Sequence, residues 1–381
     1  MRWNKPQITA FILFLLGINS LFAQTEKFNN FQPGEIWKDN KGVHINAHGG
    51  GIIYHKGTYF WYGEHKVVGK AGNVAQVGVH CYSSTDLYNW IDEGIALGVD
   101  TAKNSLLQKG CIIERPKVIY NKKTRKFVMW FHYEQKGKGY ATSKSGVATS
   151  DNATGPYTLV KIIRPDAQSW PINVLSIHKS LKFNTINATF NGGSCSKDVD
   201  SVNFVGRDFE QGQMARDMNL FVDDDGKAYH IYSSESNSTL HISQLTDDYL
   251  SHSGKWARAF VGRFMEGTSM MKRQGKYYLI ASGCTGWLPN AARYAVADNI
   301  FGPWKELGNP CVDTDAETTY HSQSTFILPV TGKKDAFIFM ADRWNAYNAI
   351  DGRYIWLPIQ FNADKMVLHY MKEWKLDVFG K

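Results

Sequence analysis

Repeated hairpin patterns constrain most strongly how this chain can fold. Residues 216–235 and 264–287 each place an acidic residue, Asp217 or Glu266, before a short apolar run, a tight turn and an aromatic-rich run. The turns carry Asp-Gly and Gln-Gly, and apolar runs joined by such turns are typical of β-hairpins. The repetition therefore predicts hairpins that carry a carboxylate at the start of their first strand.

Three further segments repeat this order of a polar first residue, a strand, a turn and a second strand. They cover residues 48–65, 114–134 and 323–344, and they begin with His48-Gly49, Glu114 and Gln323. Fragments suited to outer strands follow four of the units, at residues 81–90, 147–160, 242–250 and 294–304. Five copies of a four-stranded unit predict an all-β fold, a five-bladed β-propeller whose innermost strands surround a central channel. We therefore expect the five opening residues to converge at one mouth of that channel.

Residues 1–23 predict a signal peptide. Arg2 and Lys5 precede the apolar run ITAFILFLLGI, and small residues ending at Ala23 follow it. The run is shorter than the roughly 20 apolar residues of a transmembrane helix, so we expect no membrane span in the mature chain. The interpretation is a protein exported to the periplasm or the medium, with residues 24–381 forming one propeller domain.

Charge and cysteine content exclude several function classes. The formal net charge of +8, or +6 without Arg2 and Lys5, is modest and gives no indication of nucleic-acid binding. The five cysteines contain no CxxC pair, so a thiolate metal site is not expected and at most two disulfides could form. The chain has no P-loop and no HExxH sequence, and its HGGG run lacks the GxSxG partner of an esterase.

No cofactor is predicted to be required. The sequence VDDDGKAY lacks the spacing of an EF-hand and is better explained as a hairpin turn. A structural Ca²⁺ ion on the propeller axis remains an open alternative.

Residues 165–212 lack the hairpin pattern and form an insertion between the second and third units. Insertions of this length are usually functional loops or surface elaborations. Because this one ends just before Asp217, we expect it to border the mouth of the channel.

The acidic opening residues suit glycoside hydrolysis with inversion. That reaction uses a protonated carboxyl group and a base about 6.5–9.5 Å apart. Glu114, Asp217 and Glu266 would arrive from separate blades, and a neighbouring negative charge would raise the pKa of the acid. A single carboxylate at a strand end could instead cap a turn, but three at equivalent positions favour catalysis.

Several of these segments resemble glycoside hydrolase family 43, whose members are five-bladed propellers. The resemblance rests on RDMNLFVDDDGKAY, EGTSMMKRQGKYYL, HGGGIIYHKGTYFWYGE and DGRYIWLPIQF, and it extends over nearly all of the mature chain. It implies that Glu266 is the general acid and that Asp217 modulates its pKa. The family's usual base is an Asp of the first blade, and here His48 or Gly49 stands at that position.

The segments NAHGGGI, ERPKVIYN, TGWLPN and SQSTFILP are similar to the branch that contains exo-β-1,3-galactanases. This similarity implies that Gln323 takes the role of the base and that Glu114 assists it, with Glu114 as a direct carboxylate base the alternative. The expected substrate is a galactose-containing plant polysaccharide or oligosaccharide. Alternatives are a β-galactofuranosidase, an α-L-arabinofuranosidase or an inactive carbohydrate-binding propeller.

The resemblance also implies sugar-binding side chains. They are Glu64, His48, Tyr140, Thr285, Trp287, His321 and Arg353. Each has an ordinary structural alternative, such as a turn contact for Glu64, a buried histidine for His321 or a strand-end ion pair for Arg353. Among the aromatic residues, Trp287 and Trp61 are the candidates for a platform on which a sugar ring stacks.

Overall fold

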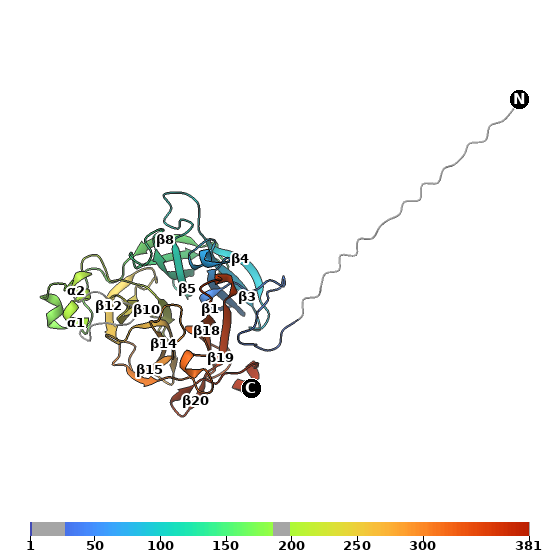
Figure 1. The fold of residues 1–381 in the computed structure, drawn as a ribbon. Helices are drawn as coiled ribbons and strands as arrows, with labels where there is room; N and C mark the ends of the chain where they lie inside the picture. Colours follow the sequence, from blue (N-terminus) through green and yellow to red (C-terminus); the bar gives the residue numbers. More distant parts are fainter. Residues whose placement is uncertain (2–26, 186–198, 381) are drawn as a thin grey trace.

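The computed structural model of this chain describes residues 1, 27–185 and 199–380. Nearly all of its regular structure is β, and the strands form sheets arranged around a central axis (Figure 1). None of the helices in these ranges is long and apolar enough to cross a membrane. Apart from Met1, the predicted signal peptide lies outside the described residues.

In the described ranges, four sheets of four strands and one of three strands form the blades. The first blade contains β1 (His48–His55), β2 (Thr58–His65), β3 (Gly78–Ser84) and β4 (Ile91–Gly98). The second contains β5 (Ile112–Asn121), β6 (Lys126–Glu134), β7 (Lys144–Ser150) and β8 (Thr158–Ile163). The third contains β9 (Met218–Val222), β10 (Ala228–Ser234), β11 (Thr239–Leu245) and β12 (His252–Ala259).

The fourth blade contains β13 (Met265–Arg273), β14 (Lys276–Gly283), β15 (Arg293–Ala297) and β16 (Lys305–Gly308). The fifth contains β17 (Gln323–Pro329), β18 (Phe337–Arg343) and β19 (Arg353–Pro358). A separate hairpin of β20 (Gln360–Asn362) and β21 (Lys365–Val367) follows. The helices are single turns: α1 (Val199–Val202), α2 (Phe204–Arg207), η1 (Lys70–Asn73), η2 (Ser176–Lys179), η3 (Ala316–Thr318), η4 (Ala349–Asp351) and η5 (Leu376–Phe379).

The first strand of each blade lines the axis. β1 contacts β5, β5 contacts β9, β9 contacts β13, β13 contacts β17, and β17 contacts β1, which closes the ring. Asn219 of β9 donates hydrogen bonds to the backbone oxygens of Thr268 in β13 (2.7 Å) and of Thr325 in β17 (3.1 Å). The predicted five-bladed propeller is confirmed.

Two-residue turns join the two strands of the first hairpin in blades one and four. Lys56 and Gly57 connect β1 to β2 with φ angles of 48° and 89°, and Gln274 and Gly275 connect β13 to β14 with 50° and 80°. Two successive positive φ angles are typical of the type I′ turn, whose twist matches that of paired antiparallel strands. Glycine at the second position allows this conformation without a steric penalty.

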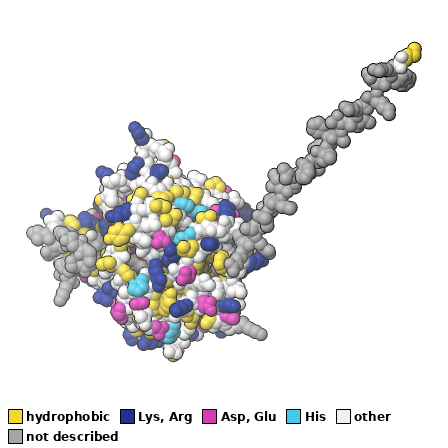
Figure 2. Space-filling view, turned by 45° about the vertical axis from the view of Figure 1, so that its right-hand side comes forward, with side chains coloured by type: hydrophobic (Ala, Val, Ile, Leu, Met, Phe, Trp, Pro, Cys, Tyr) yellow, Lys and Arg dark blue, Asp and Glu magenta, His cyan; other side chains and the backbone are white. Residues whose placement is uncertain are grey.

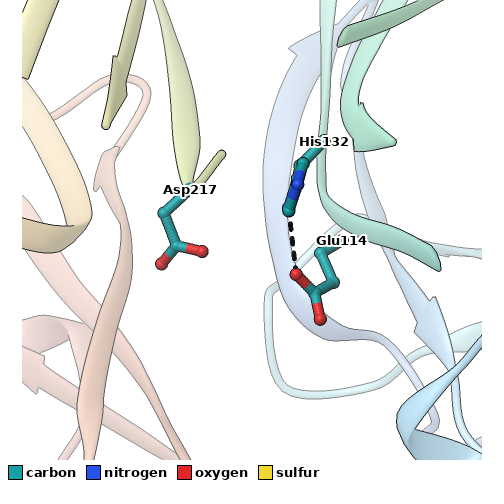
Figure 3. A group of neighbouring side chains, drawn as sticks. All are labelled: Glu114, His132 and Asp217. Carbon is teal, nitrogen blue, oxygen red and sulfur yellow. Dashed lines mark hydrogen bonds and ion pairs between the residues drawn. The ribbon is translucent and has the colours of Figure 1, made fainter. Parts of the chain in front are cut away.

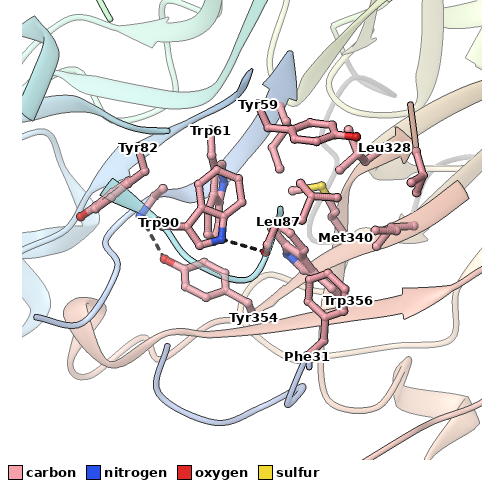
Figure 4. Packing of buried hydrophobic residues seen from close by; sticks show 14 of the residues in the cluster. Phe31, Tyr59, Trp61, Tyr82, Leu87, Trp90, Leu328, Met340, Tyr354 and Trp356 are labelled. Carbon is pink, nitrogen blue, oxygen red and sulfur yellow. Dashed lines mark hydrogen bonds between the residues drawn. The ribbon is translucent and has the colours of Figure 1, made fainter. Parts of the chain in front are cut away.

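Apolar side chains fill the space between adjacent blades, and each of the five boundaries in the described ranges has its own cluster. Figure 4 shows the cluster between the first and fifth blades, where the rings of Trp61 and Trp356 lie 4.8 Å apart. Burial of large aromatic side chains contributes strongly to stability. Trp61 is 1% exposed, so its predicted alternative role as a sugar platform is wrong.

Both ends of the described chain complete the fifth blade, which has three strands rather than the expected four. The backbone groups of Phe31 and Trp374 exchange hydrogen bonds of 2.8 and 3.1 Å, and Gly34 N donates to Tyr354 O in β19 (2.8 Å). The rings of Phe31 and Trp374 also stack at 4.3 Å. The ring of blades is therefore closed by segments more than 340 positions apart in the sequence.

The insertion between the second and third blades lies on the outside of the third blade. Ile172 N donates to Trp256 O (2.8 Å), and Arg258 N donates to Asn173 Oδ1 (3.0 Å), so the segment runs along β12. It covers a sheet edge whose backbone groups would otherwise lack partners in the protein. The helices α1 and α2 lie beyond β12 in Figure 1. Contrary to expectation, no described residue of the insertion lines the cavity at the channel mouth.

On the face seen in Figure 2, basic and acidic side chains lie interspersed. No single basic patch gathers on this face. This distribution agrees with the modest net charge.

Candidate active site

Four of the five opening residues lie at one end of the channel. Glu114 lies in β5, Glu266 in β13 and Gln323 in β17, and Asp217 directly precedes β9. The strand pairing of β5 and of β13 shifts register just after the acid. β-Bulges of this kind redirect side chains and are frequent beside active sites.

The bulges of β5 and β13 have the same backbone signature. The residue after each acid has a left-handed conformation, with φ of 54° at Arg115 and 58° at Gly267. A side chain rarely adopts this conformation, and such strain persists where the surroundings hold it in place. At Arg115 the side chain is held by several partners, which are described below.

These four opening residues line a cavity of about 280 Å³. The lining residues are Glu64, Lys66, Glu114, Arg115, His132, Tyr140, Arg216, Asp217, Asn237, Glu266, Gly286, Trp287, Gln323 and Trp344. Seven of the predicted site residues are among them: Glu266, Asp217, Gln323, Glu114, Glu64, Tyr140 and Trp287. The cavity combines carboxylates, cations and two tryptophans.

Glu266 has the environment of a protonated acid. Burial and the nearby charge of Asp217 raise the pKa of Glu266 to about 7, although Cys284, Arg115 and Arg216 act in the opposite direction. The Cys284 thiol donates to Glu266 Oε1 (3.1 Å), and Asn237 Nδ2 donates to the same oxygen (3.0 Å). Burial and the charge of Glu266 raise the pKa of Cys284 to about 12, so the thiol stays protonated and remains a donor.

Glu114 has the opposite environment. His132 Nδ1 lies 3.0 Å from Glu114 Oε2 (Figure 3), and the Tyr140 hydroxyl donates to Oε1 (2.7 Å). Burial alone would raise the pKa of Glu114, but the hydrogen bond and charge of His132, together with the charge of Lys66, hold it well below its usual range. Glu114 is therefore a carboxylate at neutral pH.

His132 lies between two carboxylates. Its Nε2 is 3.0 Å from Oε1 of Glu134, which is fully buried and accepts further hydrogen bonds from Thr142 and Ser143. Burial would lower the pKa of His132, but Glu114 and Glu134 raise it to about 9. The imidazolium thus fixes the position and the charge of Glu114.

Arg115 connects the second blade to the third and the fifth. Its guanidinium donates to Asp217 Oδ2 (2.9 Å) and to Gln323 Oε1 (2.5 Å). Gln323 Oε1 also accepts from Trp344 Nε1 (3.1 Å), and Gln323 Nε2 donates to Ser282 Oγ (2.9 Å). With two donors on its oxygen, the amide of Gln323 is well oriented but poorly disposed to accept a proton there.

The side chain of Glu64 occupies the space over Gly49, which has no side chain, at the start of the first blade. A Cβ at Gly49 would come within 2.3 Å of Glu64 Oε1, so the glycine is what admits this carboxylate. Glu64 Oε1 accepts from the Arg115 backbone (3.0 Å), and Oε2 pairs with Lys66 (2.5 Å). The first blade thus contributes its carboxylate from its second strand.

Four predicted sugar-binding residues do not line this cavity. His48 is fully buried behind it, where Nδ1 lies 3.3 Å from Asp342 Oδ1. Thr285 donates to Leu288 O (2.5 Å), and Arg353 pairs with Asp351 (2.5 Å), which is its strand-end alternative. His321 lies beside Asp315 with half of its side chain exposed, at a smaller neighbouring cavity.

Sequence reasoning missed most of the residues that surround the acids: Lys66, Arg115, His132, Arg216, Asn237 and Trp344. Strand register offers a signal for one of them, because His132 lies directly opposite Glu114 in the β5–β6 pair. By the same register Glu64 lies opposite His48. The residue opposite each opening residue is thus a candidate that a hairpin alignment can find.

The residues around the cavity do not fit a Ca²⁺ ion. Ligand atoms of Glu114, His132 and Asp217 lie within 4.8 Å of one another (Figure 3), but cationic His132 and Arg115 already neutralise these carboxylates. Deeper on the axis, the buried Lys117 Nζ donates to the backbone oxygen of Gly49 (2.8 Å). Calcium prefers six to eight oxygen ligands, and the side-chain donors of His132, Arg115 and Lys117 already occupy oxygens here.

Four of the five cysteines lie in the described ranges, and all four are free: Cys81, Cys111, Cys284 and Cys311. Cys195 lies outside the described residues. The disulfide pairs that the sequence allowed are therefore not formed among these four.

Comparison with known proteins places the site in a family context. The model of glycosyl hydrolases family 43 matches residues 198–367. A GH43 β-1,3-galactosidase solved with galactodeoxynojirimycin is 48% identical, with a TM-score of 0.86, and the match covers 91% of this chain and 100% of that chain. No curated protein sequence matches.

Two exo-β-1,3-galactanases are also similar. The enzyme from Clostridium thermocellum is 36% identical, with a TM-score of 0.73 and coverage of 90% of this chain and 66% of that chain. The enzyme from Phanerochaete chrysosporium, solved with β-1,3-galactotriose, is 28% identical, with a TM-score of 0.74 and coverage of 92% and 69%. The chain therefore spans about two thirds of the length of these two proteins.

Proposed function

Because the chain belongs to glycoside hydrolase family 43, we propose that this hydrolase releases galactose from the non-reducing end of β-1,3-galactan, with inversion at the anomeric carbon. The observation that carries the proposal is the opposite protonation of two carboxyl groups in one cavity. The pKa of Glu266 is raised to about 7, whereas that of Glu114 is held well below its usual range. The similar β-1,3-galactosidase and exo-β-1,3-galactanases support the choice of sugar and linkage.

In this mechanism Glu266 is the general acid. It transfers its proton to the glycosidic oxygen as the bond from that oxygen to the anomeric carbon breaks. Asp217 keeps the pKa of Glu266 high until the sugar binds. Arg115 pairs with Asp217 Oδ2 (2.9 Å) and holds this carboxyl group in place beside the acid.

Water attacks the anomeric carbon from the opposite face. Gln323 orients this water through its amide group, and the carboxylate of Glu114 takes the proton that the water loses. The hydrogen bonds support this division of roles, because Arg115 and Trp344 occupy Gln323 Oε1 while His132 holds the pKa of Glu114 low. Glu64 and Tyr140 lie where they can bind hydroxyl groups of the sugar, and Trp287, half-exposed, offers a face for its ring.

Export to the periplasm or the medium is part of the proposal, because a polysaccharide substrate lies outside the cell. Its support is the sequence of residues 1–23, with its basic start and apolar run. Fractionation of cells that produce the whole chain tests it: the mature protein is expected to begin near residue 24 and to be absent from the cytoplasmic fraction.

The experiment that tests the activity is incubation of the protein with β-1,3-galactan, with β-galactopyranosides, with β-galactofuranosides and with α-arabinofuranosides. NMR spectroscopy identifies the anomer that first appears. Release of α-galactose from the galactan is the expected result, since inversion of a β-linkage gives the α-anomer. Release of β-galactose would contradict inversion, and release from a furanoside alone would contradict the choice of substrate.

A further inference from the structure

The turn between β10 and β11 is strained in a way that the mechanism above does not use. Glu235, Ser236 and Asn237 have φ angles of 49°, 60° and 66°, so three successive residues other than glycine adopt the left-handed conformation. This conformation brings Cβ close to the following carbonyl oxygen; it is unfavourable at Glu235 and Ser236 and better tolerated by Asn237. Strain of this kind persists only where the surroundings hold it, and it often marks a functional site.

The turn delivers Asn237 to the acid. Asn237 Nδ2 donates to Glu266 Oε1, and the Cys284 thiol donates to the same oxygen. Among the described residues, these are the side-chain hydrogen bonds of the Glu266 carboxyl group. Because Oε1 accepts both of them, the proton of the acid form belongs on Oε2.

A buried ion pair holds the turn. Glu235 and Arg258 of β12 are both almost completely buried, and Arg258 donates from Nε to Glu235 Oε1 (2.6 Å) and from the terminal nitrogen to Oε2 (2.7 Å). His241 Nε2 lies 2.8 Å from Glu235 Oε1, and Glu235 O accepts from Ser238 N (3.2 Å). A bidentate ion pair of this type fixes the orientation of the Glu235 side chain as well as its distance from Arg258.

The inserted segment adds further contacts to the ion pair of Glu235 and Arg258. The other terminal nitrogen of Arg258 donates to Asp200 Oδ1 in α1 (2.6 Å), and His178 Nε2 lies 3.1 Å from the same oxygen. The hydrogen bond between Arg258 N and Asn173 aligns the backbone of the insertion with β12. A continuous set of contacts thus leads from the outside of the third blade to Glu266.

We propose that Glu235, Arg258 and Asp200 are positioning residues, which hold Asn237 on Glu266 so that the acid presents its proton on Oε2 to the leaving oxygen. The inference deepens the proposed function and rests on it. A buried ion pair often stabilises a fold no better than apolar side chains of the same shape. Its contribution here is the orientation of a strained turn, and the insertion has a role although none of its described residues lines the cavity.

The test uses two substrates that differ in how much they need the acid. Glycosidic bonds in β-1,3-galactobiose require protonation of the leaving oxygen, whereas 2,4-dinitrophenolate leaves an aryl β-galactoside without it. For Asn237→Ala we expect kcat on the disaccharide to fall about tenfold, and for Asp200→Asn about threefold, with KM unchanged and kcat on the aryl galactoside within about twofold.

Asp200→Asn is the critical variant because Asp200 is partly exposed and Arg258 keeps Glu235 as its partner. The control is Asp208→Asn in the same inserted segment. It weakens the pairing of Asp208 with Arg207 (2.6 Å) and with Arg164 (3.2 Å) and leaves Asp200, Arg258 and Glu235 unchanged. We expect Asp208→Asn to leave the ratio of the two kcat values unchanged. The double variant Glu235→Gln with Arg258→Met, if it folds, should lower the ratio at least as far as Asp200→Asn.

Equal losses on both substrates would overturn the inference, because a general loosening of the fold affects every substrate. An unchanged ratio in both Asn237→Ala and Asp200→Asn would also overturn it, provided that Glu266→Gln lowers the ratio. If Glu266→Gln itself lost both activities equally, the role of Glu266 as the acid would be wrong, and the inference would fall with the proposed function.

Discussion

The starts of β5 and β13 share one backbone conformation, but the pKa values of their glutamates are shifted in opposite directions. Each places a glutamate before a left-handed residue and a shift in strand register, so Glu114 and Glu266 leave their sheets in the same manner. Yet the pKa of Glu114 is held low, and that of Glu266 is raised to about 7. The repeat supplies the direction of the side chain, and the neighbours supply its charge.

The neighbours differ because of single residues around the two bulges. Glu114 lies against cationic His132, whereas the equivalent residue opposite Glu266 is Ser282, which is neutral. Asp217 comes close to Glu266 and raises its pKa. Two carboxyl groups whose pKa values are shifted in opposite directions can serve as the acid and the base of one reaction.

Glu266→Gln is expected to have the largest effect, because the amide has no proton to give to the leaving oxygen. We expect kcat on β-1,3-galactobiose to fall by about 10²–10⁴-fold at the optimal pH. Rates measured beside the exposed control Glu373→Gln, together with thermal unfolding of both variants, check this. A Glu266→Gln variant that keeps a tenth of the activity would show that Glu266 is not the general acid.

Asp217→Asn should make Glu266 more like Glu114. Asp217 raises the pKa of Glu266, so its removal lowers that pKa, and the acid loses its proton at lower pH. The basic limb of the kcat profile, which falls as pH rises through the pKa of about 7, should therefore move to lower pH. Each unit of displacement costs about tenfold in activity at pH values above the limb. A limb that stayed in place would mean that burial alone sets this pKa.

His132→Gln should make Glu114 more like Glu266. Without the imidazolium, burial dominates and the pKa of Glu114 rises, so the base takes up a proton at higher pH than before. At pH 5 the activity of the variant should be about tenfold lower than that of the original protein, and at pH 7 the loss should be smaller. Glu134→Gln, which removes the outer partner of His132, should change the profile in the same direction and less. Equal losses at both pH values in both variants would contradict the pairing.

Cys284→Ala should give the smallest change, and its sign is informative. The thiol donates to Glu266 and lowers its pKa, so removal should move the basic limb slightly to higher pH, opposite to Asp217→Asn. Cys284→Ser keeps a donor and should leave the limb unchanged, with rates within about threefold. A displacement to lower pH in the alanine variant would show that the thiol does not donate to this carboxyl group.

The sequence alone determined the repeated unit and the acids that open it. Turn residues and alternating apolar runs act over a few positions, so the hairpins from β1–β2 to β17–β18 and the alignment of Glu114, Asp217, Glu266 and Gln323 could be predicted. The resemblance to glycoside hydrolase family 43, and not the turn pattern, implied Tyr140 and the missing Asp of the first blade. Trp287 was also a candidate as an aromatic residue near a strand end. The insertion was expected at the channel mouth, but none of its described residues lines the cavity there.

The surroundings of these residues depend on contacts between segments far apart in the sequence. Arg115 meets Gln323 across 208 positions of sequence, Glu64 fills the space over Gly49, and Arg258 joins the insertion to the turn that carries Asn237. His48, Thr285, His321 and Arg353, for which the resemblance implied sugar contacts, do not line the cavity that holds Glu114 and Glu266. The physical reason is that hydrogen bonds and charges act through space at a few ångströms, whereas periodicity reports the local path of the chain. The propeller brings distant residues into one cavity, and there their mutual charges determine which carboxyl group holds a proton.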